Sequence, residues 1–213
     1  MKKQRILLAD DHKIVLEGLK GLLEREFELV GTVEDGRSLV AQAARLRPDV
    51  IVADISMPRL NGIDAVRQIK KNDPSIKVVF LTMHPDPSYA AGAFEAGASG
   101  FVLKHSASSE LVTAIKEAIQ GRTYVTPLVA GELIRTYQEK GFPTTHSPAE
   151  LSSRQREILQ LLAEGKSAKE IGAVLDISAR TVEFHKYRIM ELLNIKTSAE
   201  LVQYAVKQGL ISV

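Results

Sequence analysis

The first indication of the fold is the first apolar run of the chain, Arg5-Ile6-Leu7-Leu8-Ala9-Asp10-Asp11. This run is short, almost wholly apolar in its middle, and ends in two acidic residues. Similar short runs follow at Leu29–Val33, Val50–Ala53, Lys77–Leu81 and Gly100–Leu103. Nearly continuous apolar runs of this length are typical of strands that are covered on both faces.

Between these runs the apolar residues change to a helical period. Val15, Leu19 and Leu22 share one helix face, and Leu111 and Ile115 share another. The alternation predicts an α/β domain over residues 1–121, built on a five-stranded, parallel, doubly wound sheet of the flavodoxin-like kind. In such sheets the functional site lies beyond the carboxyl ends of the strands.

After residue 121 the pattern changes. Residues 122–147 are expected to form a partly helical linker, with a helix at Leu128–Glu139 and a flexible segment at Lys140–Pro148. Residues 148–213 have no strand pattern and are expected to form a second, all-α domain. Its predicted helices are Ser152–Ala163, Ser167–Leu175, Ser178–Leu193 and Ser198–Lys207.

The composition excludes several classes of protein. The 213 residues contain 28 basic and 26 acidic residues and no Cys, which excludes disulfides, thiolate metal sites and a cysteine nucleophile. Too few apolar residues follow Met1 for a signal peptide or a membrane helix. We therefore expect a soluble, cytoplasmic protein without a membrane partner. The surplus of two positive charges lies after residue 121, so DNA binding would need a placed helix rather than a polybasic surface.

The strand ends carry a set of residues with matching chemistry. The first strand is followed by Asp10 and Asp11, the third by Asp54, the fourth by Thr82 and the fifth by Lys104. Converging carboxylates repel one another, and a bound Mg²⁺ would resolve this repulsion. Lys104 offers a charge and Thr82 a hydroxyl to a phosphoryl group. Each residue alone is common at a strand end, but the set favours phosphoryl transfer onto a carboxylate.

These motifs resemble the receiver domain of bacterial two-component response regulators. The segments that carry the resemblance are Asp10-Asp11, Asp54-Ile55-Ser56-Met57-Pro58-Arg59-Leu60-Asn61-Gly62, Leu81-Thr82 and Gly100-Phe101-Val102-Leu103-Lys104. The resemblance implies that Asp54 takes a phosphoryl group from the histidine of a sensor kinase. It also implies that Asp10, Asp11, Asp54 and the Ser56 carbonyl hold Mg²⁺. On phosphorylation, Thr82 would move toward the phosphoryl group while Phe101 turns inward.

Three histidines lie near the predicted pocket. They are His12, His84 and His105, and His105 stands where many receivers have a proline after the lysine. Loop histidines beside a site are commonly solvated neighbours. The alternative hypothesis is that they make phosphorylation sensitive to pH or let a softer metal compete with Mg²⁺.

The second domain contains two helices joined by a short turn, at Ser167–Leu175 and Ser178–Leu193, which is the spacing of a helix-turn-helix. Ser178 is a plausible N-cap. On the second helix a buried face is predicted that holds Val182, His185, Ile189 and Leu192. The opposite face carries two aromatic residues, Phe184 and Tyr187, which suit either packing on another element or apolar contact in a DNA groove. Periodicity alone leaves a DNA reader and a protein-binding bundle open.

The residues of this segment are similar to the LuxR-type DNA-binding domain of the NarL/FixJ class of response regulators. Resemblance is carried by Leu151-Ser152-Ser153-Arg154-Gln155-Arg156-Glu157-Ile158-Leu159, Ala163-Glu164-Gly165-Lys166-Ser167-Ala168-Lys169-Glu170-Ile171 and Ile177-Ser178-Ala179-Arg180-Thr181-Val182-Glu183-Phe184-His185. It implies a recognition helix and a homodimer on paired half-sites of double-stranded DNA. Ser198–Lys207 would contribute to dimerisation, and RNA polymerase is a further candidate partner. The DNA-binding set is Lys169, Ser178, Arg180, Thr181, Glu183, Phe184, Lys186, Tyr187 and Arg188, with Glu183 where some members have Lys.

The leading hypothesis is a DNA-binding response regulator that catalyses only its own phosphorylation and dephosphorylation and is otherwise not an enzyme. A second hypothesis is a Mg²⁺-dependent phosphatase of the haloacid dehalogenase type. Such enzymes need an acidic residue two positions after the nucleophile, where this chain has Ser56. A third is a regulator that acts through protein contacts alone.

Overall fold

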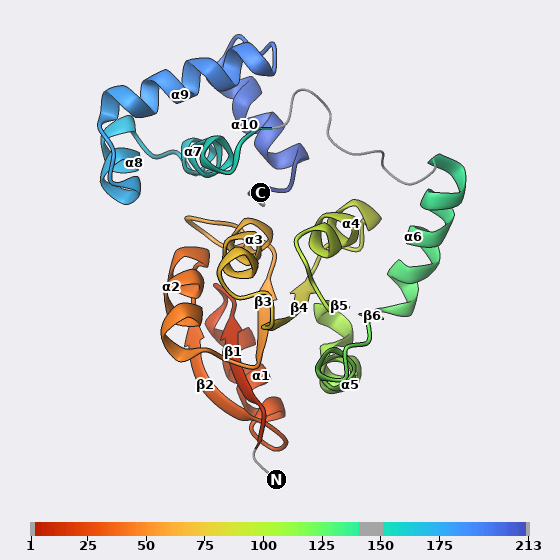
Figure 1. The fold of residues 1–213 in the computed structure, drawn as a ribbon. Coiled ribbons are helices and arrows are strands. Elements are labelled where there is room, and N and C mark those ends of the chain that lie inside the picture. Colours follow the sequence, from red (N-terminus) through yellow and green to blue (C-terminus); the bar gives the residue numbers. More distant parts are fainter. Residues whose placement is uncertain (1–2, 141–150, 212–213) are drawn as a thin grey trace. The chain divides into compact units, whose positions relative to one another are not determined.

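The computed structural model of the chain describes residues 3–140 and 151–211. These residues form two compact units, a sheet with its covering helices and a bundle of short helices (Figure 1). Most of the predicted flexible segment Lys140–Pro148, from Gly141 onward, lies outside the described residues.

The first unit is built on a parallel sheet. Its strand order is β2-β1-β3-β4-β5-β6, and every strand pair is parallel. This order confirms the predicted doubly wound sheet. The strands are β1 (Arg5–Ala9), β2 (Glu28–Val33), β3 (Val50–Asp54), β4 (Lys77–Thr82), β5 (Gly100–Leu103) and β6 (Tyr124–Val125).

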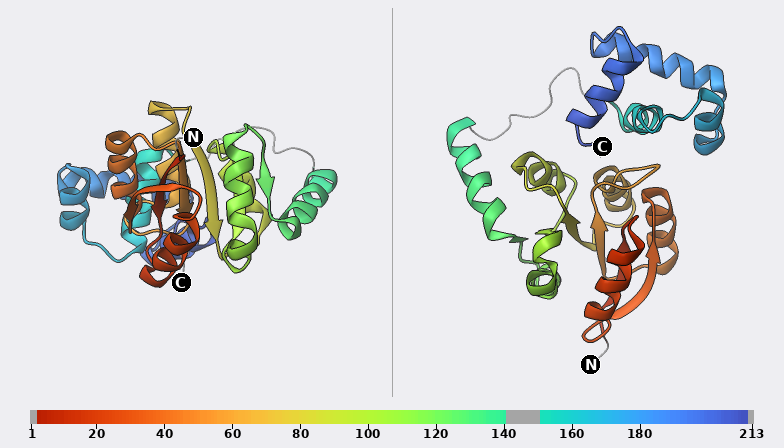
Figure 2. Two further views of the ribbon diagram at one scale, coloured as in Figure 1. Left: turned by 90° about the horizontal axis from the view of Figure 1, so that it is seen from below. Right: turned by 180° about the vertical axis from the view of Figure 1, so that it is seen from behind.

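Helices cover both faces of this sheet. α1 (Lys13–Leu23) and α5 (Ala107–Ile119) lie on one face, and α2 (Gly36–Leu46), α3 (Gly62–Asn72) and α4 (Pro87–Glu95) lie on the other (Figure 2). Alternate strand residues such as Ile6 and Leu8 pack against α1 and α5 in one buried cluster. Burial on both faces explains why the central strands read as apolar runs in the sequence.

The sixth strand was not expected from the sequence. β6 pairs with β5 through Gly100 and Tyr124, inside the segment that the sequence predicts as a linker. Two residues are too short to display a period of their own, so only the tertiary pairing defines this strand. α6 (Pro127–Lys140) follows and packs against α4, and it extends the predicted helix by one residue at each end.

The second unit is all-helical, as the sequence predicts. Its helices are α7 (Ser153–Ala163), α8 (Ala168–Leu175), α9 (Ala179–Leu192) and α10 (Ser198–Lys207). Ser152 and Ser167 form capping boxes with Gln155 and Glu170, which fixes the starts of α7 and α8. Apolar residues of all four helices meet in one core around Ile158, Ile171, Val182, Ile189 and Leu201.

Across both described stretches of the chain, every helix is too short or too polar to cross a lipid bilayer.

Candidate functional site

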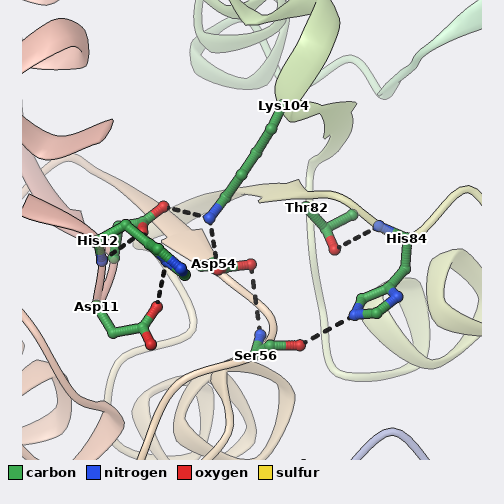
Figure 3. Close-up of polar contacts among 8 residues, drawn as sticks. Asp11, His12, Asp54, Ser56, Thr82, His84 and Lys104 are labelled. Atoms are coloured by element: carbon green, nitrogen blue, oxygen red, sulfur yellow. Dashed lines mark hydrogen bonds and ion pairs between the residues drawn. The ribbon is translucent and has the colours of Figure 1, made fainter. Parts of the chain in front are cut away.

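The acidic residues predicted at the strand ends do converge. Asp10 and Asp11 follow β1, and Asp54 is the last residue of β3, the neighbouring strand (Figure 3). Parallel strands bring their carboxyl ends to one edge of the sheet, so residues far apart in sequence meet there. Asp10 and Asp54 are almost completely buried, whereas the Asp11 side chain is one-third exposed.

Lys104 supplies a positively charged side chain to this pocket. Its Nζ lies 2.6 Å from Asp10 Oδ2 and 2.6 Å from Asp54 Oδ2. Lys104 follows β5 directly and begins a short 3₁₀ turn, Lys104–Ser106, which leads into α5. Because its side chain is only 9% exposed, the ammonium group is held between two buried carboxylates.

Burial and charge act in opposite directions on these groups. Burial raises the pKa of the Asp54 carboxyl; the nearby Lys104 lowers it in part, and Asp10 raises it again by like-charge repulsion. Burial tends to lower the pKa of Lys104, but attraction to Asp54 and Asp10 outweighs burial, so this pKa lies above its ordinary value. The pocket therefore stabilises the charged form of Lys104. Without a further cation, it disfavours two negatively charged carboxylates, Asp10 and Asp54, side by side.

The pocket fits a divalent cation. Asp10, Asp11, His12 and Asp54 each offer one ligand atom, and these atoms all lie within 4.8 Å of one another. Three carboxylates face a single Lys104 ammonium group, so about two negative charges are left without compensation. Carboxylate oxygens are the ligands that Mg²⁺ prefers, and the charge balance matches such an ion.

Two histidines contact this pocket directly. His12 Nδ1 lies 2.8 Å from Asp11 Oδ1 and 3.2 Å from Asp10 Oδ1. His84 Nε2 lies 3.2 Å from Ser56 Oγ (Figure 3). The His84 ring also stacks on the Tyr89 ring, with centroids 4.6 Å apart. His105, by contrast, is an exposed residue of the 3₁₀ turn.

The two residues of the predicted switch are both buried. The Thr82 hydroxyl accepts a hydrogen bond of 3.2 Å from the backbone N–H of His84. The Phe101 ring is fully buried in β5, so it already lies inside the unit in this structure. No peptide bond in residues 3–140 or 151–211 is cis, and the Lys104–His105 bond is therefore trans.

In the second unit, α8 and α9 are joined by a tight turn. The N–H of Ile177 donates to the carbonyl of Gly172, and Asp176 ends α8 in the left-handed conformation with φ of 53°. A Cβ on Gly172 would lie only 2.6 Å from the Ile177 carbonyl oxygen, so the close approach of turn and helix requires glycine. Ser178 then caps α9 by accepting a hydrogen bond from the Thr181 N–H, as predicted.

The outer face of α9 carries exposed aromatic rings. Phe184 and Tyr187 are 61% and 66% exposed, and Arg180 and Arg188 are exposed beside them. Val182 and Ile189 form the buried face, as predicted. The prediction for Leu192 was wrong: this last residue of α9 is 42% exposed, and Leu193 packs against the core instead. His185 is half-buried.

Comparisons with known proteins match both units. Residues 6–116 match the response regulator receiver domain, and residues 149–205 match the bacterial regulatory proteins of the luxR family. The chain belongs to the response regulators. The match to both families confirms the two-domain class that the sequence predicts, a receiver followed by a LuxR-type helix-turn-helix domain.

The relatives of this response regulator are regulatory proteins. It is 36% identical over 227 residues to the transcriptional regulatory protein DegU of Brevibacillus brevis, covering 99% of this chain and 96% of that protein. It is 36% identical to the oxygen regulatory protein NreC of Staphylococcus epidermidis, covering 97% and 99%. The RcsB response regulator of Salmonella typhimurium has a similar structure, with a TM-score of 0.65, 29% identity and 98% of this chain covered, as well as 99% of that chain.

The response regulator pocket contains contacts that sequence reasoning missed. The sequence predicts Asp10, Asp11, Asp54, Thr82 and Lys104 at one sheet edge, and the structure brings them together there. It gives no signal for the ring contacts of the two histidines. Ser56 and His84 are 28 residues apart and meet only because β3 and β4 are neighbours.

Proposed function

We propose that Asp54 accepts a phosphoryl group from the histidine of a sensor kinase and that this modification controls DNA binding by α9. The observation that carries the proposal is the buried Asp54 carboxylate, held against Lys104 at the carboxyl edge of the sheet. An Asp54 oxygen would attack phosphorus while the bond between phosphorus and the kinase imidazole breaks, giving an acyl phosphate and a neutral histidine.

The surrounding residues suit the charge that this reaction brings in. Lys104 can turn its ammonium group from the carboxylate to a phosphoryl oxygen, because both lie within the reach of one side chain. Asp10, Asp11, Asp54 and the Ser56 carbonyl would hold Mg²⁺, which supplies the positive charge that the incoming phosphoryl oxygens need. The receiver would thus catalyse its own phosphorylation and dephosphorylation, while its relatives act as transcription regulators.

Thr82 and Phe101 would pass the change to the surface. The Thr82 hydroxyl accepts from the His84 N–H, and a phosphoryl oxygen on Asp54 would compete for that hydroxyl. If Thr82 moves toward Asp54, it would stabilise the inward position of the Phe101 ring. Phosphorylation then shifts the population of two existing states rather than creating a new one.

The DNA-binding part of the proposal rests on the surface of α9. Exposed Phe184 and Tyr187 suit apolar contacts in the major groove. Cationic residues beside them suit phosphate contacts, which position a protein without specifying sequence. The RcsB protein has been solved as a complex with DNA. The proposed contact residues are Lys169, Ser178, Arg180, Thr181, Glu183, Phe184, Lys186, Tyr187 and Arg188.

We expect a homodimer to bind two half-sites in the cytoplasm, with α10 contributing to the dimer and RNA polymerase as a downstream partner. A single copy brings little net charge, since the chain carries a formal charge of only +2. Weak electrostatic attraction makes one domain a poor DNA binder, so pairing of two domains would supply the affinity.

Binding of the full chain to duplexes selected from a random pool tests the proposal. Beryllofluoride, which mimics an acyl phosphate, should tighten binding to the selected duplex, and Asp54→Asn should abolish this response. Asp73→Asn, which changes a half-buried carboxylate outside the pocket that accepts hydrogen bonds from Ser75, should keep it. Equal affinity with and without beryllofluoride in the unchanged protein would contradict control by phosphorylation, and absence of any selected sequence would favour a regulator that acts through protein contacts.

A further inference from the structure

His12 lies directly beside the carboxylates of the acidic pocket. It occupies the N-cap position of α1, yet its side chain makes no capping hydrogen bond. Its ring instead faces the carboxylates, with Nδ1 2.8 Å from Asp11 Oδ1 and 3.2 Å from Asp10 Oδ1. The His12 N–H also donates to Asp10 Oδ1 at 2.9 Å, which fixes the backbone from which the ring projects.

The spacing of these atoms suits one octahedral ion. Ligand atoms at about 2.1 Å from an ion are about 3 Å apart when adjacent and about 4.2 Å apart when opposite. The ligand atoms of Asp10, Asp11, His12 and Asp54 lie within 4.8 Å of one another, which is only slightly beyond the distance between opposite ligands of one ion.

We propose that His12 supplies an imidazole nitrogen to the cation of this pocket, so that the receiver binds Co²⁺, Ni²⁺ and Zn²⁺ far more tightly relative to Mg²⁺ than three carboxylates alone would. The inference rests on the proposed function only in taking the pocket to hold a divalent cation. Imidazole is a good ligand for these transition metals and a poor one for Mg²⁺, which keeps oxygen ligands and water. A nitrogen donor therefore shifts metal preference without abolishing the response to Mg²⁺.

The alternative role for His12 is a hydrogen-bond donor that only orients the Asp11 carboxylate. The two roles differ in what a substitution does. If His12 only donates a hydrogen bond to Asp11, its loss should change the affinity for every cation similarly, because each cation binds the same carboxylate. If His12 is a ligand, its loss should lower the affinity for transition metals selectively. His12→Gln keeps a side-chain N–H donor and removes the imidazole, so it separates the two roles.

Co²⁺ is the probe of choice because a histidine bound to it shows its remaining ring N–H far outside the ordinary proton NMR range. We expect the full chain with one equivalent of Co²⁺ to show such a signal and His12→Ala and His12→Gln to lose it. His84→Ala and His105→Ala, which change the other two histidines near the pocket, should keep it. The affinity for Co²⁺, measured by titration calorimetry, should fall roughly tenfold or more in both His12 variants, while that for Mg²⁺ changes less than about threefold.

The same signal in His12→Ala, or equal losses of Co²⁺ and Mg²⁺ affinity that His12→Gln restores, would overturn the proposal. These measurements use no phosphodonor, so they are independent of whether Asp54 is phosphorylated. Phosphorylation of Asp54 with Mg²⁺ and acetyl phosphate is followed separately by the mobility shift on a phosphate-affinity gel. A shifted His12 signal without any phosphorylation would leave this inference standing and would contradict the proposed function.

Discussion

Replacing Lys104 by Met should expose how strongly the pocket depends on one cation. Lys104 Nζ lies 2.6 Å from both Asp10 Oδ2 and Asp54 Oδ2, and both carboxylates are almost completely buried. At an effective dielectric constant of about 20, each contact corresponds to about 6 kcal/mol of attraction. Most of this offsets the cost of dehydrating the three groups, which is several kcal/mol for each ion. Removing one partner of a buried ion pair costs about 3–5 kcal/mol, because the remaining charges stay buried without compensation.

The cost of Lys104→Met should also depend on pH. Burial already raises the pKa of Asp54, and Lys104 is the group that lowers it. Without Lys104 this pKa rises further, so the native state of the variant takes up a proton at a higher pH than the unfolded state. A native state that binds more protons loses stability as pH rises, by up to about 1.4 kcal/mol per pH unit for one proton. The variant should therefore approach the unchanged protein in stability as the pH is lowered from 8 toward 5.

Differential scanning calorimetry of the full chain measures this effect. The transition that Mg²⁺ shifts belongs to the receiver, and 3–5 kcal/mol corresponds to a fall of roughly 10–20 °C in its midpoint. Added Mg²⁺ should raise that midpoint more in the variant than in the unchanged protein, because the cation then faces all three carboxylates alone. Lys116→Met removes a half-exposed surface ion pair with Glu26 and should cost less than about 1 kcal/mol. A loss below about 1 kcal/mol for Lys104→Met at pH 8, or an equal loss at pH 5.5 and 8, would refute the reasoning.

Four further predictions concern backbone space and DNA contacts. Gly62→Ala should lower the receiver midpoint sharply, by about 3 kcal/mol or more in stability, because its Cβ would lie 2.0 Å from the carbonyl oxygen at the end of β3. Gly18→Ala, in the open middle of α1, should instead stabilise by about 0.5–1 kcal/mol; a loss there would contradict the assignment of free space. Gly172→Ala should lower the transition that Mg²⁺ does not shift and weaken DNA binding, since its Cβ would lie 2.6 Å from the Ile177 carbonyl oxygen; unchanged calorimetry would count against the tight turn. Arg180→Ala should weaken binding to selected and unrelated duplexes alike and reduce the salt dependence of log K by about one, as measured by fluorescence anisotropy, whereas a loss confined to the selected duplex would identify a base contact.

The sequence predicted correctly those helices and strands that are long enough to show a local pattern of apolar or capping residues. The central strands are covered on both faces and therefore read as apolar runs. Three helices of the second unit begin directly after Ser152, Ser167 and Ser178, whose side chains cap them. β6 has only two residues, so no local pattern in the sequence could predict its pairing with β5. The Thr126 hydroxyl next to it accepts from the Leu103 N–H and donates to Glu110, contacts that tie this segment to β5 and α5.

The sequence by itself determined the chemistry at the sheet edge. A parallel sheet places all its carboxyl ends on one side, so acids after β1 and in β3 and a lysine after β5 had to meet once the strands were recognised. Only the tertiary structure decided which atoms touch: that Lys104 bridges Asp10 and Asp54, that His12 turns its ring to Asp11, and that His84 reaches Ser56. Strand direction is a property of short segments. The contacts of Lys104 and His84, by contrast, join loops that are tens of residues apart in the sequence, and the packed core of the first unit holds those loops in place.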